Sequence, residues 1–364
     1  MRTGGFSSAW GKMTESRLFL PIAVLCLILV FDFFFIPGFF NLRFEQGHLY
    51  GSLIDILRNS VPTVILAIGM TLVIATGGVD LSVGAVMAIS SSVAAIMLNP
   101  SIVGLHLSGD IGGLISDPSY SWAPLWAVIV VPLIIGTLCG LWNGVLVSYG
   151  RIQPMVATLI LMIAGRGIAQ LITNAIKIII FNDTYAYLGN GWIILPVSVF
   201  LAVFVFLAAW LLTRRTAIGM FVESVGINYR ASFYSGINEK KIKLFAYAFC
   251  GFCAGFAGLI ASSSIRTSDA NQIGLYTELD AILAVVIGGT VMGVGGRFSL
   301  LGSALGAIVL YATITSMYAL GVAASAIIAV KAAVVILVIL LYSSQVQSMI
   351  RGLGKQSVRG EVVR

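Results

Sequence analysis

Charged residues are scarce in this chain of 364 residues. Asp, Glu, Lys and Arg make up 10% of it, whereas hydrophobic residues make up 59%. Soluble domains carry about 25% charged residues, so the composition excludes a soluble globular protein. It predicts an all-α fold, a polytopic membrane helix bundle of about ten membrane-spanning helices (range eight to ten), with broken helices near the core.

Residues for metal and nucleophilic chemistry are also scarce. The only two histidines, His48 and His106, lie in segments predicted outside the membrane. The sequence contains no HExxH motif, no Ser or Cys paired with His at membrane depth and no GxxxxGK[ST] phosphate loop. These absences argue against an intramembrane enzyme. We therefore predict no catalytic residue, no metal site and no cofactor in this chain.

Cysteine is rare as well. The four cysteines all fall within predicted spans, which argues against a disulfide framework. Cys250 and Cys253 have the CxxC spacing of redox and metal sites. They lie in an apolar run without His or acidic neighbours, so we predict that they are small packing residues.

Long apolar runs are abundant, and a bilayer crossing needs about 20 mostly apolar residues. The first run contains Asp32 and lacks a cleavage pattern, which favours a span over a signal peptide. The predicted spans are residues 18–36, 57–76, 82–98, 123–149, 153–173, 193–213, 244–264, 281–292, 298–320 and 322–342. The predicted organisation is a cytoplasmic N-terminal segment 1–17, a single transmembrane domain 18–342 with a cytoplasmic loop at 214–243, and a cytoplasmic tail 343–364.

The net charge of +7 has a sided distribution. Lys and Arg fall mostly in alternate connecting segments, and acidic residues gather in the others. Since Lys and Arg are retained on the cytoplasmic side, this pattern predicts that both termini are cytoplasmic. The basic residues are scattered over several loops rather than gathered on one face, which argues against nucleic acid as a partner and leaves membrane lipids.

The segment 66–89, LAIGMTLVIATGGVDLSVGAVMAI, sets Asp80 between glycines where two apolar runs meet. Asp80 or Ser82 can cap the amides that open the next helix. Broken polar backbone at membrane depth is tolerated only where protein buries it or water lines it, so the segment predicts a transport protein. Segment 282–309 has a similar glycine-rich break; repeated halves and a chance likeness both stay open.

The connecting segment 219–243, GMFVESVGINYRASFYSGINEKKIK, is predicted to form a short amphipathic helix. Such a helix can present apolar side chains to a groove in another protein, with charged residues fixing the register. It can equally lie on the lipid surface. The side chains expected to be presented are Phe221, Val222, Val225 and Ile227.

Four ordered motifs, VDLSVGA, QPMVATLILMIAGRG, ESVGINYRASFYSGI and LDAILAVVIGGT, resemble permease subunits of bacterial sugar ABC importers. The branch is that of ribose, galactose and galactofuranose uptake, the galactofuranose permeases above all, and the likeness runs from about residue 51 to 306. It implies a bacterial inner-membrane location, inward transport of a monosaccharide, ABC ATPase subunits that bind ATP and Mg, a periplasmic sugar-binding protein and a second, identical or similar permease subunit. It also implies that the loop couples to the ATPase through Glu223, Gly226, Arg230 and Gly236.

Polar residues at membrane depth are the candidates for the translocation pathway, because each costs free energy in lipid. They are Asp80, Asn143, Gln153, Arg166 and Gln170. Lining of the pathway and structural pairing stay open for each. We hypothesise that Arg166 or Lys331 neutralises Asp80 in one transport state. Because no cluster of hydrogen-bonding groups with an aromatic platform stands out, we expect a weak, water-filled passage rather than a tight sugar pocket.

An ion-driven secondary carrier is the main alternative, because it too needs broken helices and carboxylates at mid-membrane. The two differ in their dependence on the loop. A carrier transports without an ATPase, so changes in the loop should matter little to it, whereas an ATP-coupled permease should lose transport.

Overall fold

The computed structural model describes residues 18–45, 47–99, 123–290, 295–323, 326–327, 329–333 and 336. It falls into two compact units, Met1–Ala312 and Thr313–Arg364. Almost all of the described residues belong to the first unit. The predicted segments 1–17 and 343–364 and part of the predicted span 322–342 lie outside the described residues, so the single transmembrane domain with cytoplasmic ends stays a prediction.

Six of the described helices are long and apolar enough to cross a membrane. They are α3 (Ser52–Ala75), α6 (Leu125–Ser148), α7 (Pro154–Thr173), α9 (Val197–Arg215), α12 (Glu239–Ile265) and α14 (Leu300–Ala319). Each coincides with a predicted span. The predicted all-α polytopic membrane bundle is therefore confirmed.

Three further predicted spans are shorter helices: α2 (Phe19–Phe35), α4 (Val83–Leu98) and α13 (Thr277–Ile287). With 16 and 11 residues, α4 and α13 extend only about 24 Å and 16 Å at 1.5 Å per residue. A bilayer core is about 30 Å thick. Each of these two helices is shorter than that thickness and adjoins one of the predicted glycine-rich breaks.

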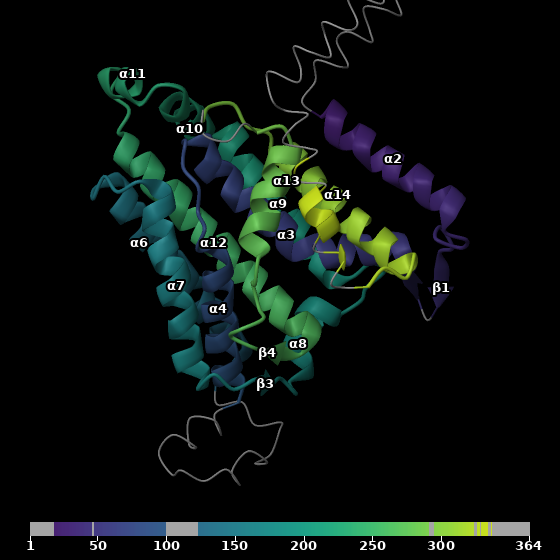
Figure 1. The fold of residues 1–364 in the computed structure, drawn as a ribbon. Coiled ribbons are helices and arrows are strands. Elements are labelled where there is room, and N and C mark those ends of the chain that lie inside the picture. Colours follow the sequence, from purple (N-terminus) through teal and green to yellow (C-terminus); the bar gives the residue numbers. More distant parts are fainter. Residues whose placement is uncertain are drawn as a thin grey trace, which may run out of the picture. The chain divides into compact units, whose positions relative to one another are not determined.

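The remaining described elements lie at the ends of the long helices. They are α8 (Asp183–Asn190), α10 (Ile218–Ile227), α11 (Tyr229–Tyr234), the antiparallel pair β1 (Arg43–Glu45) and β2 (His48–Tyr50), and the antiparallel pair β3 (Ile178–Ile179) and β4 (Thr267–Ser268). Figure 1 shows α10 and α11 at one end of α12, and β3, β4 and α8 at the other. The chain order requires this, because α12 follows α11 and runs into β4.

Helix α12 packs against α6, α3 and α4, and therefore lies at the centre of the first unit (Figure 1). Its contact with α6 depends on small residues: a Cβ on Gly140 would overlap the carbonyl oxygen of Tyr247. Its contact with α3 uses Cys250 and Cys253, which are buried and not disulfide-bonded. A Cβ on Gly69 would lie 2.9 Å from the Cβ of Cys253. The CxxC pair is thus a packing element, as its apolar setting predicted.

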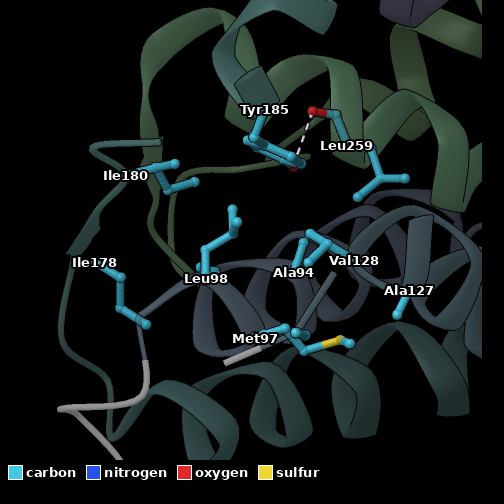
Figure 2. Packing of buried hydrophobic residues seen from close by; sticks show 11 residues of the cluster. Ala94, Met97, Leu98, Ala127, Val128, Ile178, Ile180, Tyr185 and Leu259 are labelled. Atoms are coloured by element: carbon cyan, nitrogen blue, oxygen red, sulfur yellow. Dashed lines mark hydrogen bonds between the residues drawn. The ribbon is translucent and has the colours of Figure 1, made fainter. Parts of the chain in front are cut away.

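A cluster of buried hydrophobic residues packs between the helices at the β3–β4 end (Figure 2). Ala94 and Leu98 of α4 and Val128 of α6 pack there with Tyr185 of α8. The Tyr185 ring is fully buried. Its hydroxyl donates to the Leu259 carbonyl oxygen at 3.2 Å, the dashed line in Figure 2, and lies 2.7 Å from the Ser262 hydroxyl.

Replacing Tyr185 with phenylalanine should lower the stability by about 1 kcal/mol, because it removes the hydroxyl and keeps the ring. Tyr185→Ala should cost more, about 3–5 kcal/mol, because it also leaves a cavity. Thermal unfolding of the purified chain in detergent measures both. Equal losses for the two variants would show that the hydroxyl, and not the packing of the ring, holds α8 to α12.

Candidate functional site

The break between α3 and α4 begins with a left-handed glycine. Helix α3 ends at Ala75, and Gly77 has a φ of +83°. The Gly77 amide donates to the Ile74 carbonyl at 2.9 Å, and the Gly78 amide donates to the Val73 carbonyl at 3.1 Å. A glycine in this conformation terminates a helix and satisfies its last carbonyls.

The break after α13 has the same turn. Gly289 also has a φ of +83°, its amide donates to the Val286 carbonyl at 2.9 Å, and the Thr290 amide donates to the Val285 carbonyl at 3.2 Å. The two broken elements also touch, since α3 packs on α13. The sequence likeness of segments 66–89 and 282–309 therefore has a structural counterpart in the turn that ends the first helix of each.

Asp80 lies in the first break and is 1% exposed. Its Oδ1 accepts hydrogen bonds from the Ser82 amide at 2.9 Å, from the Ser82 hydroxyl at 2.6 Å and from the Asn143 side-chain amide at 3.3 Å. The Asn143 amide also donates to the Ser82 hydroxyl at 2.8 Å. Asp80 thus binds the amide of Ser82, the residue before α4, and, contrary to the prediction, neither Asp80 nor Ser82 caps the first amides of that helix.

The backbone of the break is held by two more helices. The Val79 carbonyl oxygen accepts from the Tyr247 hydroxyl of α12 at 3.4 Å and from the Thr158 hydroxyl of α7 at 3.5 Å. Buried polar groups need such partners. Asp80, Ser82 and Asn143 therefore form a satisfied polar cluster that ties the break to α6, α7 and α12, with one exception at the Asn143 Oδ1, which has no partner among the described residues.

Arg166 and Gln170 lie elsewhere and hold a different segment. The Arg166 guanidinium donates to the carbonyl oxygens of Ala270 at 2.9 Å and Ile273 at 2.6 Å. The Gln170 amide donates to the Asn271 side chain at 2.6 Å. Both residues thus bind the link between β4 and α13. In this conformation the Arg166 guanidinium donates to backbone carbonyls, and the hypothesis that Arg166 neutralises Asp80 in one transport state stays a prediction. Lys331 belongs to the second unit, and its pairing with Asp80 stays a prediction.

A cleft of about 450 Å³ opens at the α10–α11 end. It is lined by the break residues 76–78, the last turn of α6, the link 151–153, Tyr229 of α11, and the first turns of α12. Gln153 lies on its wall. This side chain is exposed and does not cap α7. The five predicted pathway residues thus fall into three locations. Asp80 and Asn143 lie in the polar cluster at the first break, Arg166 and Gln170 bind the link between β4 and α13, and Gln153 faces the cleft.

Helix α10 rests against both breaks. The Gly296 amide, in the second break, donates to the Ala75 carbonyl oxygen at 2.8 Å. A Cβ on Gly226 would overlap both of these atoms. The end of α10 therefore fits against the point where the two broken elements meet, and this close approach of three backbone segments requires glycine at 226.

The apolar face that α10 presents differs from the predicted one. Val222 and Val225 were expected to face a partner, but both are buried, because α10 packs against α9, α12 and α3. This prediction was wrong for the two valines. Ile227 is exposed, as predicted. We define the exposed α10–α11 surface by the side chains of Met220, Ile227, Arg230, Phe233 and Tyr234.

The other predicted coupling residues occupy different positions in the same segment. Glu223 is half-buried, on the stretch of α10 that borders Gly296. Arg230 is exposed, and its Nε donates to the Tyr229 hydroxyl at 3.1 Å. Gly236 has a φ of +83° and forms the turn between α11 and α12. Their coupling role stays a prediction. The segment is packed on the helix breaks, so it is more than a helix resting on lipid.

Several cleft residues were missed by sequence reasoning. Glu239 and Lys243 form an ion pair at 3.8 Å, and their i,i+4 spacing in the sequence could have revealed it. Tyr229 and Arg151 carried no such signal. They reach the cleft only because α11 and the link before α7 meet at the same end of the bundle.

Comparison with known proteins gives a consistent set of relatives. The family model described as branched-chain amino acid transport system / permease component matches residues 52–343. The chain is 45% identical to the galactofuranose transporter permease protein of Escherichia coli K12, over 91% of each chain. It is 37% identical to a fructose import permease protein of Bifidobacterium longum, over 93% of this chain and 91% of the relative. It is 34% identical to the ribose import permease protein of Escherichia coli K12, over 92% and 95%. No solved structure matches the chain.

Proposed function

The chain belongs to the family of branched-chain amino acid transport system / permease components, and we propose that it is the membrane permease subunit of an ABC importer that carries a monosaccharide into the cytoplasm. Members of this family are transport subunits rather than enzymes, and the chain is a multi-pass inner-membrane protein. The observation that carries the proposal is the contact of α10 with both helix breaks at Gly226. The relatives favour an importer over an ion-coupled carrier.

The α10–α11 surface is the proposed docking site for a cytoplasmic ATPase subunit. It combines exposed aromatic and aliphatic side chains with Arg230, the mixture expected of an interface core with a charged rim. ATP and Mg bind to the ATPase. Closure of the ATPase moves α10, and Gly226 transmits the movement to Ala75 and Gly296. A rigid shift of this kind can exchange the inward-facing and outward-facing states.

The proposed cargo is a monosaccharide, because the relatives are named for galactofuranose, fructose and ribose. A periplasmic sugar-binding protein delivers it, and a second permease subunit, identical or similar, completes the membrane passage. The α10–α11 end faces the cytoplasm together with both termini. Arg214 and Arg215 at the end of α9, and Lys240 and Lys241 at the start of α12, support this orientation.

The docking proposal is tested with the double variant Phe233→Ser/Tyr234→Ser. Both side chains are exposed, at 66% and 88%, so the substitutions should leave folding intact. Copurification of the ATPase and ATP-driven sugar uptake should each fall roughly tenfold or more, since losing anchor side chains at an interface commonly costs more than 1 kcal/mol each. Phe44→Ser, which changes an exposed aromatic on β1, is the control. Wild-type copurification by the double variant would refute the docking site.

A further inference from the structure

The cleft at the α10–α11 end has the size of a small-molecule site. Its volume of about 450 Å³ lies within the roughly 300–1,000 Å³ of typical ligand pockets. It lies directly beside the first break, because Thr76, Gly77 and Gly78 form part of its wall.

The wall of the cleft offers hydrogen-bond donors and acceptors together. Helices α3 and α6 end there and α7 and α12 begin there, so both carbonyl-rich and amide-rich helix ends contribute to it. Among the side chains, Arg151 and Lys243 donate, Glu239 accepts, and the Gln153 amide does both. The ion pair of Lys243 with Glu239, at 3.8 Å, compensates one of the two positive charges.

One tyrosine adds accessible aromatic surface to this polar wall. Tyr229 of α11 lines the cleft and its side chain is exposed. Tyr247 of α12 lies behind it, fully buried and with its hydroxyl bound to the Val79 carbonyl, so the Tyr229 ring is the one that a ligand can reach. A neutral polyol is the ligand that such a wall fits, because each hydroxyl both donates and accepts and its C–H faces pack on aromatic rings.

We propose that this cleft is an inner binding site for the transported monosaccharide, occupied before the sugar leaves for the cytoplasm. This inference rests on the proposed function and adds a binding site for the transported sugar. The site is weak, because Gln153 is exposed and the cleft is open to solvent. Tyr229 belongs to the segment that touches the ATPase, so a sugar in the cleft contacts the coupling machinery. By linkage, occupancy and loop position then influence each other.

Binding is measured by saturation-transfer NMR on the purified full chain in detergent, with D-galactose, D-ribose and D-fructose as probes. At least one sugar should give a transfer signal with the wild type. Gln153→Trp, which fills the cleft, and Gln153→Ala, which removes its amide, should each weaken that signal about threefold or more. Gln272→Ala, an exposed glutamine between β4 and α13, is the matched control and should bind as the wild type does.

Either of two results would overturn the inference: no signal from any of the three sugars with the wild type, or wild-type signals with both Gln153 variants. ATP-driven uptake of the same sugars, by vesicles that contain the complete importer, is a separate measurement. Its failure in the wild type would refute the proposed function, whereas normal uptake without sugar binding in the cleft would refute this inference alone.

Discussion

Gly226→Ala is expected to reduce ATP-driven sugar uptake tenfold or more while the chain still reaches the membrane. The added Cβ would overlap the Ala75 carbonyl oxygen and the Gly296 amide, which are bonded to each other at 2.8 Å. Both are backbone atoms, so no side-chain rotation relieves the overlap, and packed interiors yield little. Helix α10 must therefore move away from the breaks. A change of about 1.4 kcal/mol in the balance of states is enough for a tenfold effect.

Gly167→Ala is the matched control for this experiment. It also places a methyl group on a helical glycine, but a Cβ there would meet nothing within 4 Å. Alanine has the higher helix propensity, so this variant should be as stable as the wild type or slightly more so. Uptake and sugar-stimulated ATPase activity, measured on the complete importer, compare the two. Wild-type coupling by Gly226→Ala would show that α10 does not act through the meeting point of the breaks.

Asp80→Ala is expected to lower the free energy of unfolding by about 2–4 kcal/mol and to abolish uptake. The substitution removes the acceptor for the Ser82 amide and hydroxyl and for the Asn143 amide, all of them buried. Leaving buried donors without partners costs about 1–3 kcal/mol each, reduced here because Asn143 keeps its bond to the Ser82 hydroxyl. Asp80→Asn keeps an oxygen at Oδ1 and should lose only about 1 kcal/mol.

Thermal unfolding in detergent and the abundance of the chain in membranes measure these losses. Asp183→Ala is the control, because that carboxylate is exposed and pairs with Arg266 at the surface, where an ion pair contributes at most about 1 kcal/mol. A stable Asp80→Ala variant would contradict the structural role of the cluster. Normal uptake by a well-assembled Asp80→Asn variant would remove the Asp80 charge from the transport mechanism.

Hydropathy and glycine placement were sufficient to predict the long helices and the breaks. Apolar runs of about 20 residues mark α6, α7 and α12, and the glycines around 77 and 289 mark the turns. These features are local, so a single sequence contains them. The lengths of α4 and α13 are also local, since each begins or ends at a glycine-rich break.

The orientation of α10 could not be predicted in the same way. Its ten residues are apolar on more than one side, and periodicity does not tell which side faces the chain's own bundle. Val222 and Val225 were therefore expected at the partner surface that Phe233 and Tyr234 of α11 help to form. Only the packing of α10 on α3, α9 and α12 decides between the two sides.

The hydrogen-bond partners of the polar residues could not be predicted from the sequence either. Charge balance suggested a cation for Asp80, but its acceptor is used by the neutral side chains of Ser82 and Asn143. Arg166 was one of two candidate partners of Asp80 in one transport state, and in this conformation it donates to two backbone carbonyls. These pairings depend on how α6 and α7 are rotated against the break, which spacing along one chain does not specify.

The link between the two breaks is made of main-chain atoms, the amide of Gly296 and the carbonyl of Ala75. In the proposed mechanism this backbone hydrogen bond would couple the movement of the two breaks without any side chain. Alanine scanning of α3 and α14 would leave both backbone groups in place, so it would not detect the contribution of this hydrogen bond. Replacing the peptide bond between Gly295 and Gly296 with an ester exchanges this N–H for an oxygen and leaves every side chain in place, so it removes the hydrogen bond to Ala75 directly.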